Sequence, residues 1–345
     1  MNITKKRIKY IDIAKCIAML LVIHNHWALD YNNSAIKIFI ASFHMPLFFL
    51  LSGLTLKTPD NLKDLGIHIL KRIKTILLPF YLWSFCYMGF GLRKAAFILY
   101  GSNRSISNVG GIGGSWFLPC FFVADILACL AFYVTRKNGK YLGLLAILYF
   151  VVSFGLNFIN LGYDFPFNLD VAFSGAAFIC IGHYADEKKV FDVIEKNNSL
   201  KKSILAGVFF ILTGLFAFLN VPAYNNDFGR LVMALGYYGY FWMFVLSGLA
   251  GALLVIIISM NLQNLKLSNY LAMIGTNTFT ILLMQQFVID LIEKVIKKLD
   301  VSLMFIYPII LSVICIVICD VASRLLVEIY PNLKGFGILP KLDKI

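Results

Sequence analysis

Residues 10–26 read YIDIAKCIAMLLVIHNH, an apolar run interrupted by a few ionisable side chains. As a helix, about 20 apolar residues span a hydrocarbon core of roughly 30 Å. Nine further apolar runs of comparable length follow, at residues 36–56, 75–92, 116–133, 142–160, 170–184, 203–219, 239–260, 271–291 and 302–322. The sequence therefore predicts an all-α, polytopic membrane protein of about ten transmembrane helices.

The composition supports this fold class. The 345 residues are 60% hydrophobic and 14% charged, with a mean hydropathy of +0.80, whereas roughly a quarter of the residues in a soluble domain are charged. Soluble enzymes, disordered scaffolds and coiled coils are thereby excluded. The net charge of +13 does not indicate nucleic-acid binding, because the basic residues lie in short segments between apolar runs. We expect one integral membrane domain over residues 1–345.

The basic residues also predict the orientation, because cytoplasmic segments of membrane proteins carry an excess of Lys and Arg. With a cytoplasmic N-terminus, 22 of them fall in inner segments and 7 in outer segments, which predicts that both termini are cytoplasmic. No small-residue cleavage site follows the basic segment Met1–Lys9, so the first run is expected to be retained. The seven cysteines lie within apolar runs and are expected to behave as small core residues.

Ionisable groups inside the bilayer are costly and usually face an internal cavity. At about 100° per residue, one helical stripe is formed by Asp12, Lys15, Met19, Val22 and His26. Lys15 and His26 are separated by roughly 16 Å of helical rise, and Asp12 is placed to pair with Lys15, whereas His24 faces another direction. The stripe predicts a polar central cavity. The alternative is an interfacial ion pair with a snorkelling lysine and a polar histidine tip.

Two later segments allow similar pairs of interpretations. Residues 42–53 read SFHMPLFFLLSG, in which His44 precedes a proline whose missing N–H frees a carbonyl. This pattern is typical of a cavity-lining kink or of a simply packed one. The basic cluster Lys71, Arg72 and Lys74 indicates either a phosphate-binding site or contact with lipid headgroups at the cytoplasmic face.

Further polar residues within the runs are Asp125, Asp290, Asp320, Asn277, Gln285 and Gln286. A proton-coupled transporter uses such carboxylates as a relay, but no inverted repeat with paired broken helices is visible. No group of His, Cys and Asp shows the spacing of metal ligands, so no metal site is expected.

Several motifs occur in a fixed order over residues 7–290. They are Lys15 followed eleven residues later by His26, FHMPLFFLLSG at 43–53, a basic run before LLPFYLW at 77–83, WFLP at 116–119 and GTNT at 275–278. Together they resemble the acyltransferase-3 family of membrane proteins, most closely its branch of small sugar O-acetyltransferases without an additional extracytoplasmic domain. That family has about ten membrane spans, which agrees with the apolar runs.

The resemblance implies an acyltransferase of the bacterial cytoplasmic membrane that moves an acetyl group from cytosolic acetyl-CoA to a hydroxyl of a cell-envelope or exported glycan. Its partners would be acetyl-CoA, a glycan or lipid-linked sugar acceptor and the bilayer, with no permanently bound cofactor. His26 would act as general base or acyl carrier. Lys15, held by Asp12, would lie near the donor. His44, Trp116 and Asn277 would line the cavity around the acceptor. Lys71, Arg72 and Lys74 would bind the head of CoA.

The sequence departs from the family pattern at three places. Lys15 stands where arginine is usual, Leu282 and Gln285 stand where tyrosine and histidine are common, and Thr75 replaces a frequent arginine. Two other functions remain open: transfer of a succinyl or other acyl group to an exported polysaccharide, and transport or flipping of an envelope precursor. Binding or hydrolysis of acetyl-CoA would separate an enzyme from a flippase.

Overall fold

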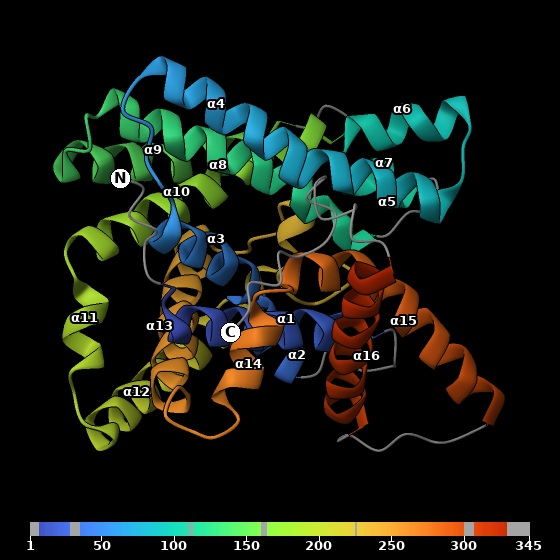
Figure 1. Ribbon diagram of the computed structural model, residues 1–345. Coiled ribbons are helices and arrows are strands. Elements are labelled where there is room, and N and C mark those ends of the chain that lie inside the picture. Colours follow the sequence, from blue (N-terminus) through green and yellow to red (C-terminus); the bar gives the residue numbers. More distant parts are fainter. Residues whose placement is uncertain are drawn as a thin grey trace.

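The computed structural model describes residues 7–27, 35–108, 110, 113–159, 164–224, 226–299 and 307–329 (Figure 1). The α-helices are α1 (Lys9–His26), α2 (Ala35–Ala41), α3 (His44–Thr55), α4 (Leu62–Arg72), α5 (Leu78–Met88), α6 (Leu92–Tyr100), α7 (Asn103–Ser107), α8 (Phe117–Val134), α9 (Gly139–Asn157), α10 (Leu169–Glu187), α11 (Val190–Glu195), α12 (Ser199–Leu219), α13 (Phe241–Leu262), α14 (Ser268–Gly275), α15 (Thr278–Leu299) and α16 (Tyr307–Ile329). Shorter turns are the π-helix η1 (Ile73–Leu77) and the 3₁₀ helices η2 (Gly113–Trp116), η3 (Pro166–Asn168), η4 (Val221–Ala223) and η5 (Met233–Leu235).

The all-α prediction is confirmed: within these ranges the only β-pairing is an isolated bridge between Val232 and Tyr237. Six helices are long and apolar enough to cross a membrane, namely Ala35–Thr55, Gly114–Val134, Gly139–Asn157, Ser199–Ala223, Phe241–Leu262 and Pro308–Leu326. The other predicted spans lie on α1, α5, α10 and α14–α15, which are shorter, interrupted or more highly charged. The total of ten spans and the cytoplasmic location of both termini stay predictions. Residues 302–306 of the tenth run lie outside the described residues.

Three predicted spans have different boundaries in the structure. The run 36–56 is broken between α2 and α3. Pro46 has no N–H and cannot donate to the Ser42 carbonyl. That carbonyl accepts a 3.4 Å hydrogen bond from Ser247 Oγ instead. The run 271–291 is likewise divided, between α14 and α15. The run 75–92 belongs to a longer continuous helical stretch formed by α4, η1 and α5, which ends at Gly89, where φ is +72°.

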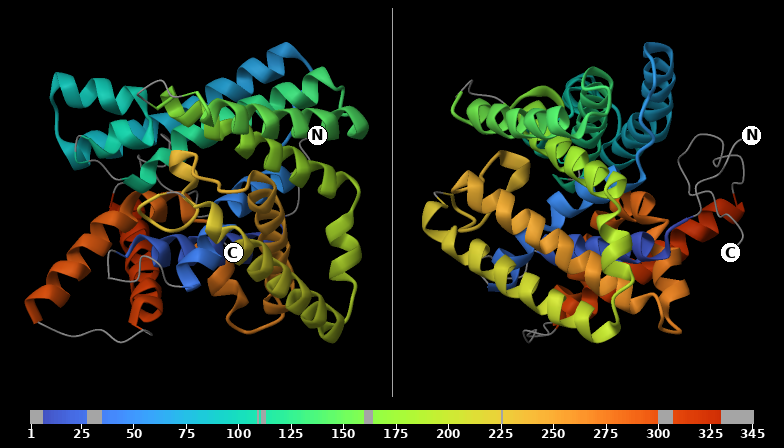
Figure 2. Two further views of the ribbon diagram at one scale, coloured as in Figure 1. Left: turned by 180° about the vertical axis from the view of Figure 1, so that it is seen from behind. Right: turned by 90° about the vertical axis from the view of Figure 1, so that its left-hand side faces the viewer.

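The helices form two layers with α3 between them (Figures 1 and 2). One layer contains α4, α5, α6, α8, α9 and α10, and the other contains α1, α2 and α12 to α16. The helix α3 packs on α10 of the first layer and on α1 and α13 of the second. Because α1 contacts α3 as well as α14, α15 and α16, one part of its surface packs within its own layer and another part faces the region between the layers.

Glycines allow the closest helix crossings. A Cβ at Gly53 of α3 would collide with the Ile179 carbonyl of α10, and a Cβ at Gly182 of α10 would collide with the Leu50 carbonyl of α3. Small residues let helix backbones approach each other in membranes. The Gly53 of the motif at 43–53 is therefore a packing residue.

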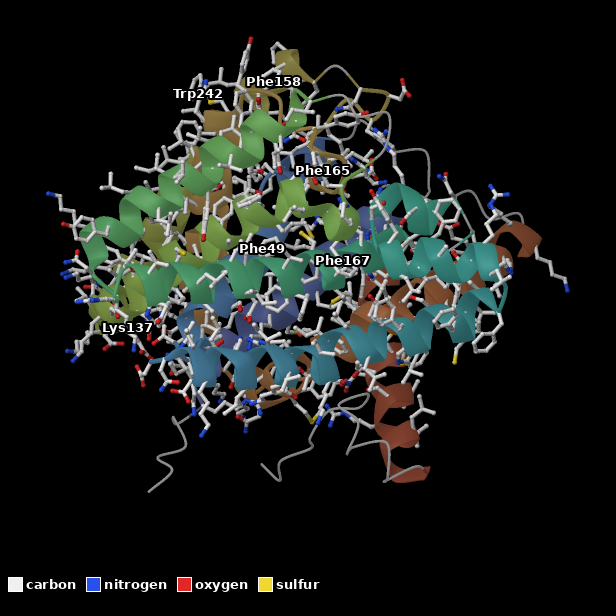
Figure 3. All side chains as sticks on the ribbon, turned by 90° about the horizontal axis from the view of Figure 1, so that it is seen from above. Phe49, Lys137, Phe158, Phe165, Phe167 and Trp242 are labelled. Carbon is white, nitrogen blue, oxygen red and sulfur yellow. The ribbon has the colours of Figure 1, made fainter. Side chains whose placement is uncertain are left out.

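The outer surface of the bundle is apolar, as expected for contact with lipid. Figure 3 shows Phe158 and Trp242 at the edge of the bundle, where they are 74% and 57% exposed, whereas Phe49 lies inside and is fully buried. The helix α12 presents exposed Ile204, Phe210 and Ile211 along its length. This surface, together with the six apolar helices, identifies a membrane protein.

Candidate functional site

A cavity of about 710 Å³ lies between the layers, with walls from α1, α3, α8, α15 and the segment 228–235. This volume is in the range of small-molecule sites, roughly 300–1,000 Å³. Four of the five residues of the predicted polar stripe line it: Lys15, Met19, Val22 and His26. Because α1 is an uninterrupted α-helix, Lys15 and His26 mark two ends of this wall, roughly 16 Å apart in helical rise.

At the Lys15 end, a buried carboxylate holds two cations. Asp12 Oδ1 lies 3.6 Å from Lys15 Nζ, and Asp12 Oδ2 lies 2.5 Å from Arg7 Nε. The Asp12 side chain is only 6% exposed, and a buried charge needs such partners to offset its lost hydration. The pair predicted from the three-residue spacing is therefore present, and Arg7 adds a second cation.

Arg72 also lines the cavity and is held by an aspartate of α8. Its Nη2 and Nε atoms donate to Asp125 Oδ1 and Oδ2 at 2.7 and 3.1 Å, a bidentate arrangement that fixes the guanidinium in position. Asp125 is fully buried and lies eight residues beyond Phe117, or roughly 12 Å along α8. Since Gly114, just before α8, contacts His26, Arg72 lies toward the Lys15 end.

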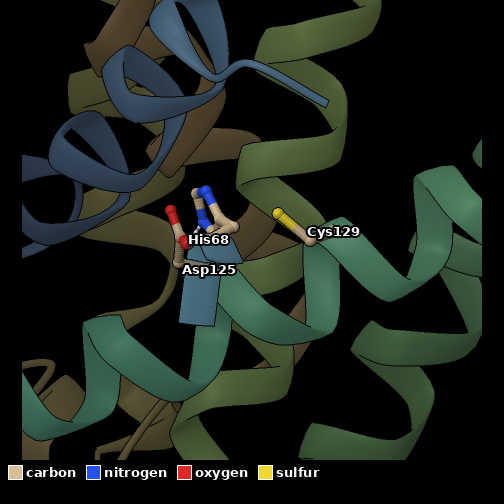
Figure 4. Close-up of side chains that lie close together, drawn as sticks. All are labelled: His68, Asp125 and Cys129. Carbon is tan, nitrogen blue, oxygen red and sulfur yellow. Dashed lines mark hydrogen bonds and ion pairs between the residues drawn. The ribbon is translucent and has the colours of Figure 1, made fainter. Parts of the chain in front are cut away.

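His68 and Cys129 lie beside the same carboxylate (Figure 4). His68 Nε2 contacts Asp125 Oδ2, and the ligand atoms of His68, Asp125 and Cys129 lie within 4.8 Å of one another. Such a group has the atoms to hold a metal ion. However, the Arg72 guanidinium already engages both carboxylate oxygens, and a cation placed there would be repelled by it. The geometry fits a charge cluster that positions Arg72.

The other two predicted donor-site residues point elsewhere. Lys71 and Lys74 are exposed, and neither lines the cavity, although both flank Arg72 on the continuous helix formed by α4 and η1. Successive helical positions differ by about 100°, so one residue of this cluster faces inward while its neighbours face solvent or lipid headgroups.

At the other end, the His26 imidazole packs against a glycine. A Cβ at Gly114 would stand 2.7 Å from His26 Cε1 and 3.2 Å from Nε2, so only a residue without a side chain fits beside the ring. His26 Nδ1 is buried without a hydrogen-bond partner among the described residues. The neighbouring Gln285 is fully buried, and neither of its amide atoms has a partner in that part of the chain. Unpaired buried polar groups are rare, so this end of the wall is suited to a polar ligand.

The predicted acceptor residues divide into two groups. His44 and Trp116 line the cavity, and His44 Nδ1 is 2.9 Å from the Ile40 carbonyl at the break between α2 and α3. Asn277 does not line it: its amide donates to Asp320 Oδ1 at 3.0 Å and to Ser323. It therefore joins the start of α15 to α16.

The structure also places at the cavity residues that the helical periodicity of the sequence did not associate with it. Arg230, in the loop before α13, lines the cavity and lies within electrostatic reach of His26 and His44. Burial lowers the pKa of the Arg230 guanidinium, but arginine remains protonated in proteins. On another wall, Tyr87 donates to Asp290 Oδ2 at 3.0 Å. A lone arginine in a predicted loop has no periodicity, so no sequence signal placed Arg230 here.

Comparison with known proteins gives one match. A family model described as an acyltransferase domain, of the acyltransferase-3 family, matches residues 8–324. The match includes every residue named above as lining the cavity. No curated protein and no solved structure matches the chain.

Proposed function

Because the chain belongs to the acyltransferase-3 family and is an acyltransferase of the membrane, we propose that it transfers an acetyl group from acetyl-CoA to a hydroxyl of a glycan. One observation carries the proposal: Lys15 and His26 lie on one wall of a single cavity. A cationic end and a histidine end are thereby joined inside the bundle. A donor and an acceptor can then meet without leaving the protein.

The donor enters from the Lys15 end. The three cations Arg7, Lys15 and Arg72 exceed the two carboxylates that pair with them, and this excess of positive charge attracts the phosphates of CoA. The thioester-bearing arm of CoA then extends along the stripe of α1 past Met19 and Val22. The roughly 16 Å of rise between Lys15 and His26 is of the same order as the length of that arm, so the acyl carbon reaches the histidine.

His26 acts as the general base on the acceptor, since a neutral imidazole is suited to proton transfer near physiological pH. It takes the hydroxyl proton while the hydroxyl oxygen bonds to the thioester carbonyl carbon. Collapse of the tetrahedral intermediate breaks the carbon–sulfur bond, and the proton passes from His26 to the departing sulfur. Arg230 lines the cavity within electrostatic reach of His26 and stabilises the oxyanion.

The chain provides a matched control for this role. His24 is the same residue type on the same helix but does not line the cavity. In proteoliposomes supplied with radiolabelled acetyl-CoA and a glycan acceptor, His26→Ala abolishes acetyl transfer, and His24→Ala retains it within a few-fold. Mass spectrometry of the glycan identifies the product. Continued acetylation by His26→Ala, or failure of the wild-type protein to bind or consume acetyl-CoA, would refute the proposal.

A further inference from the structure

A second pocket of about 390 Å³ adjoins the cavity at its His26 end. It lies between α7 and the loop that precedes α13. Asn103, Phe228 and Leu235 line both the cavity and this pocket. The two cavities therefore border each other at these three residues.

The pocket offers neutral polar groups beside aromatic rings. The side chains of Asn103, Ser107 and Asn108 make no hydrogen bond to any other described residue, and each can both donate and accept. Phe228 and Tyr237 are 38% and 36% exposed. Their rings provide apolar surfaces of the kind that the C–H face of a sugar packs against, while the amides and the hydroxyl match sugar hydroxyls.

The walls of the pocket are fixed before any ligand arrives. Asn226 Nδ2 donates to the Arg230 carbonyl at 3.0 Å, and Asn226 Oδ1 accepts from the Phe228 backbone N–H at 3.0 Å. On the facing side, Arg104 pairs with Asp164 at 3.1 Å through Nε and at 3.0 Å through its backbone N–H. A preformed pocket binds with a smaller entropic cost than one that must be ordered.

The charges of the pocket favour an uncharged ligand. Its cation, Arg104, is already paired with Asp164, and Asp227 places a carboxylate on the opposite side. A phosphate or a uronic acid would be repelled by Asp227, whereas neutral sugar hydroxyls can donate to it.

We propose that this pocket binds a second, neutral sugar unit of the acceptor, so that the enzyme acts preferentially on glycans of two or more units. The inference rests on the proposed function, because it extends the acceptor path away from His26. Arg230 connects the two parts: its carbonyl holds Asn226 in the pocket wall, and its side chain lines the cavity.

The test compares acceptors of increasing length. Glucose, cellobiose and cellotriose, and N-acetylglucosamine, chitobiose and chitotriose, are offered to the wild-type protein and to the double variant Asn108→Ala/Asp227→Ala. Neither side chain has a hydrogen bond within the described chain, so the fold is preserved. Asn197→Ala, in the loop between α11 and α12, is the matched control. Transfer is followed by mass spectrometry, and binding by saturation-transfer NMR in nanodiscs.

The wild-type protein is expected to favour a disaccharide over its monosaccharide about tenfold in kcat/KM, which corresponds to about 1.4 kcal/mol. The double variant removes this ratio, and Asn197→Ala keeps it. Equal kcat/KM values for monosaccharides and disaccharides, or an equal loss of kcat/KM for both in the double variant, would overturn the proposal that the pocket binds a second sugar. Neither result would contradict acetyl transfer itself. Pocket-dependent binding without any acetyl transfer would support the pocket and refute the proposed reaction. Absence of glycan binding altogether would overturn the pocket.

Discussion

Gly114→Ala displaces the proposed catalytic base without altering its chemistry. The new Cβ would stand 2.7 Å from His26 Cε1, whereas ordinary contact begins at about 3.4 Å, so the ring must move by about 0.7 Å. The other neighbour of the new Cβ, the Gln285 amide nitrogen, lies 3.6 Å from it and is not displaced. Ser115 and Trp116, which follow in the chain, are buried. The imidazole, which borders the cavity, therefore yields before the backbone does.

The size of the effect follows from this displacement. A misplacement of about 1 Å of a reacting group costs on the order of a hundredfold in rate. For a shift of about 0.7 Å, we expect kcat to fall between about tenfold and a hundredfold, equivalent to about 1.4 to 2.7 kcal/mol of transition-state stabilisation. The KM for acetyl-CoA should change little, because the proposed site for the head of CoA is at the other end of the cavity.

The assay uses purified protein in nanodiscs with saturating acetyl-CoA and a glycan acceptor. Product is measured by mass spectrometry, because Cys86, unlike the other six cysteines, is exposed and not the core residue that the sequence predicted, and its free thiol would react with a thiol-detecting dye. Gly143→Ala, in α9, is the control, since a Cβ there meets nothing within 4 Å and alanine favours the helix over glycine by about 1 kcal/mol. Wild-type activity in Gly114→Ala would refute the argument, as would a loss of thermal stability that accounts for the lost activity.

Three further predictions concern the donor site and the packing. Arg72→Lys keeps the charge but loses the bidentate contact with its aspartate, so the KM for acetyl-CoA should rise about tenfold. In the control Lys71→Ala this KM should stay within about twofold of the wild-type value. Initial rates at varied acetyl-CoA concentration measure both KM values, and equal effects of the two substitutions would contradict the prediction. Gly275→Ala drives a Cβ into the Asp12 carbonyl. This overpacking should lower the free energy of unfolding by about 1–3 kcal/mol and with it the midpoint of thermal unfolding. Asn277→Ala should also lower that midpoint and leave both KM values unchanged, whereas a raised acceptor KM at an unchanged midpoint would place Asn277 in the site.

The helical fold and one wall of the cavity could be predicted because both depend on local periodicity. Apolar runs give the helices, and the 100° step places Lys15 and His26 on one face of α1. The proline pattern at 44–46 indicates the break between α2 and α3, whereas no local pattern gives the break between α14 and α15. What the sequence does not give is the neighbour of the carbonyl that Pro46 frees, because Ser247, whose hydroxyl lies 3.4 Å from the Ser42 carbonyl, is about two hundred residues away.

The donor end was harder to predict, because side chains distant in sequence decide it. Three basic residues lie close together at 71–74, and their helical positions show only that they cannot all face the same way. Asp125 selects Arg72 as the inward one through two hydrogen bonds across more than fifty residues. Neither that contact nor the approach of Arg230 from a loop is encoded in a local pattern.

The motifs shared with the family combine cavity residues with packing residues. In the segment 43–53, Ser52 lines the cavity while Gly53 allows α3 to cross α10. In the segment 275–278, Thr278 lines the cavity, and Gly275 allows α14 to approach the backbone of Asp12. Because Asp12 holds Lys15, that glycine acts on the donor end through the position of α1. A motif residue can therefore be required for activity without touching either substrate, and only the separation of thermal stability from KM distinguishes the two roles.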